Sequence, residues 1–325
     1  MLKKNISISG GSGFLTKNLS NYLDRKKYNV TLITRSNKTK EILEAEHKDT
    51  LVKVVDWNNV SQIKECLKDT QIFIHAGAIL PTRSDANDYK IIRSSLKVAK
   101  NICRANLNLE KFIFISTLRT CIEIGKDQFI DNSKYNFYKY DTAYGRSKYL
   151  TEKYFIRHKD RLPLIICSPA HIIGPESELI AKSNTFIINY LKKNFVFYTS
   201  AKYAVIDILD ACKAIDLIIS KSDTGQKYLL CSHNPTLKEI IKICENITNK
   251  KIKIFIPMFI INLISLIFDI LNKKFGLKKI PINRSSYYFA KLKTDFVGQN
   301  IIDLGIKYQN LSSTITNIKV SFEKK

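Results

Sequence analysis

The sequence predicts an α/β fold with a doubly wound parallel sheet and a smaller C-terminal lobe, and three observations carry that prediction. A glycine cluster separates a short strand from a helix near the start of the chain. Apolar runs then alternate with helical segments as far as residue 117, a pattern typical of parallel sheets with right-handed crossovers. With 325 residues, the chain is long enough to bury a large core and to form a second lobe.

The glycine cluster, residues 10–13, marks the turn from the first strand to the first helix. Ile6 and Ile8 alternate with small or polar residues, as in a strand, whereas Leu19 and Leu23 recur at helical spacing. The N–H groups and the dipole of a helix N-terminus favour negative charge, so this Rossmann-type junction predicts binding of a dinucleotide pyrophosphate. The predicted contacts are Gly10, Gly11, Ser12, Gly13, Phe14 and Leu15.

One position departs from the usual glycine pattern, because Thr16 stands where a third glycine is common. That glycine serves the close packing of helix against strand more than phosphate contact. We therefore expect dinucleotide binding to persist with a slightly displaced helix.

The second strand, residues 29–34, is followed by Arg35. The end of this strand faces the adenosine ribose. An acidic side chain there accepts hydrogen bonds from the 2′-hydroxyl of NAD, whereas an arginine accommodates the 2′-phosphate of NADP. The sequence therefore favours NADP over NAD, and the alternative is that Arg35 is a solvated loop residue.

The third apolar run, residues 51–55, leads to Asp56. Its carboxylate is placed where it could meet an adenine amino group. Alternatively, Asp56 caps a helix that begins near Ser61. The sequence leaves both roles open.

The next two strands end in residues suited to a ligand site. Residues 71–78 form the fourth strand and end in small residues, which permit a flat cofactor to pass close by. After a helix over residues 86–106, the fifth strand, residues 111–117, ends in two hydroxyl side chains. Ligands bind at the carboxyl ends of such strands, near the point where strand order reverses. The predicted site residues are Ala76, Gly77, Ala78, Ser116 and Thr117.

A tyrosine and a lysine four residues apart, Tyr144 and Lys148, supply candidate catalytic groups. On a helix this spacing puts the phenol and the ammonium on one face, where the cation is expected to lower the pKa of the tyrosine from about 10. A partly ionised tyrosine can act as a general base. Beside a dinucleotide motif and a strand that ends in two hydroxyls, the pair predicts a catalytic site.

The composition argues against several other classes of site. The formal net charge is +24, but the lysines are scattered, so solvated helical faces are expected rather than nucleic-acid binding. The seven cysteines form no C-x-x-C pair, which argues against a zinc site and indicates buried thiols in the reducing cytoplasm. His171 and His233 are expected to be structural, and no metal is predicted. No long apolar stretch begins the chain, so no signal peptide is expected.

Residues 255–271 form a nearly continuous apolar stretch that lies near the lower limit for a membrane span. Asn262 and Asp269 lie seven residues apart and mark one helical face as polar. We therefore expect an amphipathic helix that packs its apolar stripe on the small lobe or on a partner, without binding lipid vesicles. The alternative is peripheral membrane attachment, aided by the basic segment 273–279.

Together these features resemble the extended short-chain dehydrogenase/reductase family, which includes the NAD-dependent nucleotide-sugar epimerases and dehydratases. The resemblance covers most of the chain. It implies that Thr117 or its neighbour hydrogen-bonds the reacting oxygen, that Tyr144 transfers a proton and that Lys148 holds the nicotinamide ribose. Besides the residues above, it rests on Ser168-Pro169, Gly174-Pro175, Val205 to Asp210, Gly225 to Tyr228 and Asp303 to Gly305, and it adds Pro169 to the cofactor-binding residues.

Three departures from the family's pattern bear on the substrate. Arg93 replaces a common asparagine, and Ser168 replaces an arginine that often precedes the proline. Sugar 4,6-dehydratases carry an Asp-Glu pair after the active-site threonine, where this chain has Leu118-Arg119. Without that acid and base, dehydration is not expected.

These expectations combine into an NAD(P)-dependent oxidoreductase or epimerase that exchanges hydride with a carbinol or ketone carbon. The favoured substrate is a nucleotide sugar, with the protein acting as a 4-epimerase or a 4-ketoreductase. The alternatives are a carbonyl reductase similar to 3β-hydroxysteroid dehydrogenases or dihydroflavonol reductases, and a non-catalytic nucleotide-binding protein.

The expected organisation is a cytoplasmic homodimer with two lobes in each subunit. Residues 1–175 are expected to form the dinucleotide-binding Rossmann domain. Residues 176–325 are expected to supply most of the substrate-binding lobe, with residues 204–231 returning to the first domain.

Overall fold

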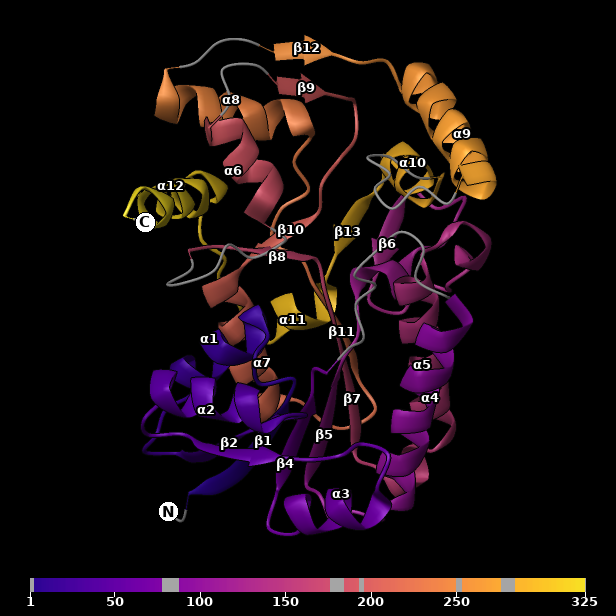
Figure 1. Cartoon of the computed structure of the whole chain (residues 1–325). Coiled ribbons are helices and arrows are strands. Elements are labelled where there is room, and N and C mark those ends of the chain that lie inside the picture. The colour runs from indigo at the N-terminus through magenta and orange to yellow at the C-terminus, as the bar shows by residue number, and fades with distance from the viewer. Residues whose placement is uncertain are drawn as a thin grey trace.

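The computed structural model describes residues 3–77, 88–175, 184–192, 196–249, 253–275 and 284–324. At its centre lies a seven-stranded parallel sheet with the order β11-β7-β5-β4-β1-β2-β3 (Figure 1). The strand order reverses between β1 and β4, so the predicted doubly wound α/β fold is confirmed. The strands are β1 (Lys4–Ser9), β2 (Tyr28–Thr34), β3 (Leu51–Val54), β4 (Ile72–His75), β5 (Lys111–Ile115), β7 (Leu164–Pro169) and β11 (Lys227–Leu230).

Helices cover both faces of the sheet (Figure 1). One face carries α1 (Phe14–Tyr22), α2 (Asn37–Glu46) and α7 (Ile208–Lys221). The other carries α3 (Val60–Leu67), α4 (Asp88–Arg104) and α5 (Ala143–Arg157).

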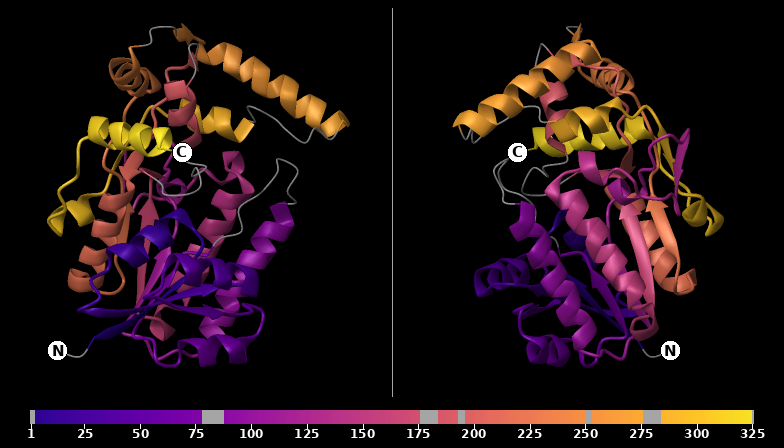
Figure 2. Two further views of the ribbon diagram at one scale, coloured as in Figure 1. Left: turned by 60° about the vertical axis from the view of Figure 1, so that its left-hand side comes forward. Right: turned by 90° about the vertical axis from the view of Figure 1, so that its right-hand side faces the viewer.

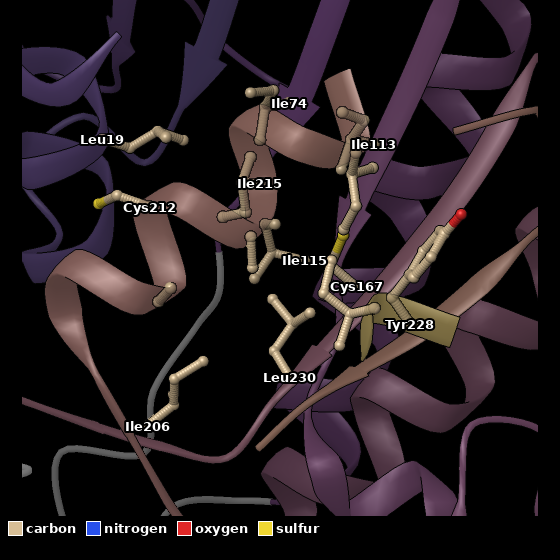
Figure 3. Packing of buried hydrophobic residues seen from close by; sticks show 14 of the residues in the cluster. Leu19, Ile74, Ile113, Ile115, Cys167, Ile206, Cys212, Ile215, Tyr228 and Leu230 are labelled. Atoms are coloured by element: carbon tan, nitrogen blue, oxygen red, sulfur yellow. The ribbon is translucent and has the colours of Figure 1, made fainter. Parts of the chain in front are cut away.

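Successive side chains along each strand point to opposite faces of the sheet and so pack in two separate hydrophobic layers. In β5, Ile113 and Ile115 pack in the layer of α1 and α7, whereas Phe112 and Phe114 pack in the layer of α4 and α5. Figure 3 shows Ile215 of α7 beside the strand residues of the first layer. Each fully buried side chain of this size contributes roughly 1.5–3 kcal/mol, so the two layers fix the sheet beneath the site.

The second lobe lies above the carboxyl ends of the strands (Figure 1). Its helices α6 (Thr185–Lys192), α8 (Leu237–Thr248) and α12 (Leu311–Glu323) share a hydrophobic cluster. It also contains α9 (Met258–Phe275) and α10 (Arg284–Lys291), whereas α11 (Gln299–Asp303) packs against β11 of the central sheet. Three parallel strand pairs complete it: β8 (His171–Ile173) with β10 (Val205–Asp207), β9 (Val196–Tyr198) with β12 (Lys253–Phe255), and β6 (Gln128–Ile130) with β13 (Asp295–Val297).

The long apolar segment does not pack as the sequence suggests. The expectation that α9 packs its apolar stripe on the small lobe is wrong for the described chain, because Phe259, Leu263 and Ile270 are exposed, whereas packing of the stripe on a partner stays a prediction. The side chain of Asn262, on the predicted polar face, accepts a hydrogen bond from Arg284 of α10. Within the described ranges, no helix is long and apolar enough to cross a membrane.

Candidate active site

The glycine turn brings the end of β1 against the end of β4. Gly10 has φ +79°, a conformation that side chains strongly disfavour, and a Cβ there would lie 3.0 Å from the backbone nitrogen of Gly77. The hydroxyl of Thr16 is 2.6 Å from the carbonyl oxygen of Gly10 and 2.9 Å from that of Gly13. Thr16 therefore stabilises the turn whose third glycine it replaces.

The N-terminus of α1 suits an anion. Gly13 is its N-cap, and in the described structure no side chain caps the helix or places a carboxylate in its first turn. Ser12 is exposed, and Phe14 and Leu15 are partly buried behind the turn. The N–H groups of Gly11 and Gly13 donate to the carbonyl oxygens of Ile33 and Gly10, so a dinucleotide pyrophosphate would meet the other N–H groups at the start of α1.

Arg35 and Asp56 end the two neighbouring strands on this side of the sheet. Arg35 is exposed directly after β2, where α2 begins behind its N-cap Ser36. Asp56 accepts hydrogen bonds from the backbone and side-chain nitrogens of Asn58, which lower the pKa of its carboxyl. The alternative role of Asp56 as a helix cap is wrong, because Asn59 caps α3.

The end of β4 is fixed by a buried histidine. His75 Nδ1 lies 2.8 Å from the Ser9 hydroxyl, and that hydroxyl accepts from the backbone N–H of Gly77 at 3.3 Å. Burial and then the charge of Lys148 lower the pKa of His75 to about 3, so its imidazole is neutral. Ala76 and Gly77 follow the strand, and the predicted contact Ala78 lies outside the described residues.

Helix α5 carries Tyr144 and Lys148 to the end of β5. Lys148 is buried, and its Nζ donates to the carbonyl oxygen of Ile115 at 2.6 Å. The next two residues are Ser116 and Thr117, both buried, and Thr117 begins a short 3-10 helix over Leu118–Cys121. The structure thus brings Lys148 beside the strand end on which Ser116 and Thr117 lie.

The expected effect of Lys148 on the pKa of Tyr144 is wrong in this structure. Burial raises the pKa of Tyr144 to about 12, and burial lowers the pKa of Lys148 to about 7. Desolvation dominates both shifts because it disfavours the charged form of each group. The cation that does lower the pKa of Tyr144 is Arg119, and it acts against Asp141.

A buried ion pair that the sequence analysis did not predict lies on the face of α5 that carries Tyr144 and Lys148. Glu152 lies one turn beyond Lys148, and its carboxylate accepts from Ser116 Oγ at 2.8 Å and from Lys227 Nζ of β11 at 2.6 Å. Its charge raises the pKa of Lys148 against the effect of burial. The spacing of Tyr144, Lys148 and Glu152 at four-residue intervals is the signal that could have revealed it.

Arg119 was noted in the sequence only as a departure from the dehydratase pattern. Its Nε donates to Asp141 at 2.5 Å, and its guanidinium carbon lies 4.5 Å from the ring centre of Phe289 in α10. The other carboxylate oxygen of Asp141 accepts from the hydroxyl of Tyr135 at 2.9 Å. Arg119 therefore links the end of β5, the start of α5 and the second lobe.

We expect Arg119→Met to lower the free energy of unfolding by about 3 kcal/mol. The side chain of Asp141 is fully buried, so the substitution leaves a carboxylate in a low dielectric without its cation. Urea unfolding measures the change. As a control, Lys4→Met removes the exposed Lys4–Glu110 pair and should cost less than about 1 kcal/mol. Equal losses in the two variants would contradict a special role for Arg119.

The remaining candidate residues lie in β7, in β8 and directly after β11. Pro169 is buried at the end of β7, and the neighbouring Ser168 has a buried hydroxyl without a hydrogen-bond partner in the described structure. His171 stacks on Tyr203 at 4.4 Å, and burial and the charge of Arg119 lower its pKa to about 4. His233 Nε2 lies 2.9 Å from the carbonyl oxygen of Gln309. Among the described residues, no cluster of side chains is arranged to hold a metal ion.

The fold and this arrangement define an enzyme of the dinucleotide-dependent dehydrogenase type. A model of the NAD dependent epimerase/dehydratase family matches residues 6–231. The chain therefore belongs to that family, and it is an NAD(P)-dependent enzyme of the extended short-chain dehydrogenase/reductase type.

Solved structures share the fold over nearly the whole chain. The protein gox2253 superposes with a TM-score of 0.82 at 18% identity, over 99% of this chain and 98% of its own. A UDP-glucuronic acid 4-epimerase from Bacillus cereus, solved with NAD, gives 0.75 at 16% identity over 98% and 99%. The yeast methylglyoxal/isovaleraldehyde reductase Gre2, solved with NADPH, gives 0.70 at 17% identity over 98% of both chains. No curated protein matches the chain significantly.

Proposed function

We propose that this enzyme acts on a nucleotide sugar, as a 4-epimerase or a 4-ketoreductase. The observation that carries the proposal is the contact of Lys148 with the carbonyl oxygen of Ile115, which holds the lysine beside Ser116 and Thr117. Tyr144 lies one helical turn before Lys148 on the same face of α5. The glycine turn at the other strand end suits the pyrophosphate of the cofactor.

We assign each residue a separate task in the reaction. When bound, a nicotinamide cofactor would supply the hydride exchange with a carbinol or ketone carbon. Tyr144 gives its phenolic proton to the oxygen when the ketone is reduced and takes it back when the alcohol is oxidised. Thr117 orients that oxygen by a hydrogen bond. Lys148 holds the nicotinamide ribose.

The raised pKa of Tyr144 suits the proton donor of the reductive half of the proposed reaction. A pKa of about 12 keeps the phenol of Tyr144 protonated at neutral pH, as a proton donor must be. Oxidation requires the phenolate, so it depends on a nearby positive charge. Arg119 supplies one such charge, because it lowers the pKa of Tyr144.

A second candidate, a carbonyl reductase for an apolar ketone, is favoured by the exposed apolar face of α9 in the second lobe. The fold likeness to the yeast reductase Gre2 is compatible with it. The likeness to the UDP-glucuronic acid 4-epimerase supports the nucleotide-sugar proposal in the same way.

The products distinguish these functions. The purified enzyme is incubated with UDP- and GDP-sugars and, separately, with apolar ketones, each with NADH or NADPH. An epimerase converts one sugar into its C4 epimer without net consumption of cofactor, which chromatography and NMR detect. A reductase oxidises one NAD(P)H for each alcohol formed. Turnover of apolar ketones alone would refute the nucleotide-sugar proposal.

Arg35 is proposed to select NADP. Replacing it with Ala should weaken NADPH binding by about 10–100-fold and leave NADH binding nearly unchanged, since only NADPH carries a 2′-phosphate for the guanidinium to contact. Fluorescence titration of both cofactors against both proteins measures this. An equal loss for the two cofactors would make Arg35 a solvated loop residue.

The compartment and the assembly also belong to this proposal. We propose a reducing compartment, the cytoplasm, because all seven cysteines are free and six of them are buried. A homodimer stays a prediction, which light scattering of the purified protein tests.

A further inference from the structure

Helix α9 carries an exposed apolar stripe on its outer side. The helix lies along the top of the molecule with α10 beneath it, and no described element covers its outer side (Figure 2). The stripe residues recur at spacings of three or four, so they share one face of the helix. They are Phe259, Leu263, Leu266, Ile267 and Ile270, with exposed fractions of 72%, 57%, 40%, 47% and 62%.

The inner side of α9 carries the buried Ile261 and two polar side chains that already have a hydrogen-bond partner. Arg284 of α10 donates to Asn262 Oδ1 at 2.5 Å and to Ser265 Oγ at 3.2 Å. The same guanidinium donates to the hydroxyl of Tyr288 at 2.7 Å. Ser265 is fully buried in this contact. Rotating α9 to bury its apolar stripe would break these hydrogen bonds. The hydrogen bonds therefore keep the stripe on the outer side of the helix.

The exposed apolar surface continues past the start of α9. Phe255 in β12 is 49% exposed, and Phe197 in the paired strand β9 is 54% exposed. Figure 1 shows β9 and β12 at the upper end of the lobe, before the chain enters α9. With α9 itself about 27 Å long, the stripe and these two rings make an apolar surface larger than isolated exposed residues produce.

The net charge of the surrounding sequence indicates which kind of partner binds this apolar surface. Residues 246–294 contain ten lysine or arginine residues and one acidic residue, Asp269. This segment of 49 residues therefore carries a net charge of +9, out of +24 for the whole chain. Lysines stand on both sides of the apolar helix in the sequence, at 250, 251 and 253 before it and at 273, 274, 278 and 279 toward and beyond its end.

We propose that α9 docks this enzyme on the surface of an anionic phospholipid bilayer. The helix lies in the plane of the interface, with its apolar stripe in the boundary between headgroups and acyl chains. A helix that docks in this way does not cross the bilayer. Attraction between the basic segment and an anionic surface adds to the burial of the stripe.

A second copy of the chain is the competing occupant of the stripe. Pairing two α9 helices face to face would bring together two segments of charge +9, which repel each other. An anionic bilayer covers the same apolar residues and neutralises the charge. The charge therefore favours the bilayer over a dimer.

Co-sedimentation tests the proposal with the full-length protein. The vesicles are pure phosphatidylcholine or phosphatidylcholine with about one third phosphatidylglycerol, each at low and at high salt. We expect binding to the anionic vesicles at low salt, at least about tenfold weaker binding at high salt, and little binding to the neutral vesicles.

Matched variants locate the surface. Ile267→Glu with Ile270→Glu should weaken binding to anionic vesicles by at least about tenfold, because it puts two charges into the stripe. The control Val320→Glu changes a side chain of α12 that is 44% exposed, and it should bind as the parent does. Circular dichroism and thermal unfolding check that both variants are folded.

Three outcomes would overturn the proposal. They are no vesicle binding by the parent, equal binding by the stripe variant, and a dimer in light scattering that the stripe variant abolishes while vesicles are not bound. None of these outcomes bears on the proposed reaction, because that reaction is assayed without lipid. A failure of the sugar assay likewise leaves the vesicle result standing.

Discussion

Replacing Tyr144 with Phe should lower turnover by about 10²–10⁴-fold in the direction of ketone reduction. The variant keeps the ring and its packing but lacks the phenolic proton that the reduced oxygen must receive. Cofactor affinity should stay within about twofold, because the dinucleotide contacts proposed for the glycine turn and Lys148 remain. Steady-state rates with the substrate found in the product assay, and a separate titration of NAD(P)H, measure the two effects.

The control for this variant lies on the same helix. Tyr149 also belongs to α5, and its ring centre lies 4.2 Å from that of Tyr135, with the two rings tilted by 35°. Tyr149→Phe removes one phenolic hydroxyl from α5, as Tyr144→Phe does, and should leave turnover nearly unchanged. If both variants lost the same activity, or if Tyr144→Phe remained active, the assignment of Tyr144 as the proton donor would fail.

Replacing Lys148 with Met should abolish activity and yet stabilise the protein. Turnover and cofactor affinity should both fall, because the ammonium is assigned to the nicotinamide ribose. Stability should rise by about 1–4 kcal/mol near pH 6, since a buried charge costs more than its hydrogen bond to Ile115 returns. Methionine has a similar length and no charge to desolvate.

The pH dependence of stability identifies the source of that gain. Burial lowers the pKa of Lys148 from 10.5 to about 7. Between these values the unfolded chain binds more protons at this site than the folded protein, so the stability of the parent rises with pH. The methionine variant lacks this rise, and its advantage should disappear above about pH 10. An advantage that stays constant with pH would show that Lys148 is not desolvated as the structure indicates.

Local sequence patterns predict the parts of the fold that are encoded over a few residues. The glycine turn, the strand before it, the helix after it and the Tyr144–Lys148 spacing follow from periodicity and from residues with special backbone freedom, which act over a few neighbours. The parallel sheet and the family followed from the order of these local patterns.

The charges around the site depend on contacts between distant parts of the chain. Glu152 pairs with Lys227, which is 75 residues away in the sequence, and Arg119 reaches Asp141 and the ring of Phe289. No local pattern encodes such contacts. The pKa of Tyr144 could not be predicted for the same reason. Burial raises this pKa by more than the charge of Arg119 lowers it, and burial is a property of the assembled fold.

The orientation of α9 was decided in the same way. Periodicity showed that the helix has a polar and an apolar face, but not which of the two meets protein. The answer depends on Arg284, a cation 22 residues beyond Asn262 that needs hydrogen-bond acceptors from the helix. Arg284 donates to Asn262 and Ser265, and these hydrogen bonds turn that side of α9 toward α10 and leave the apolar stripe exposed.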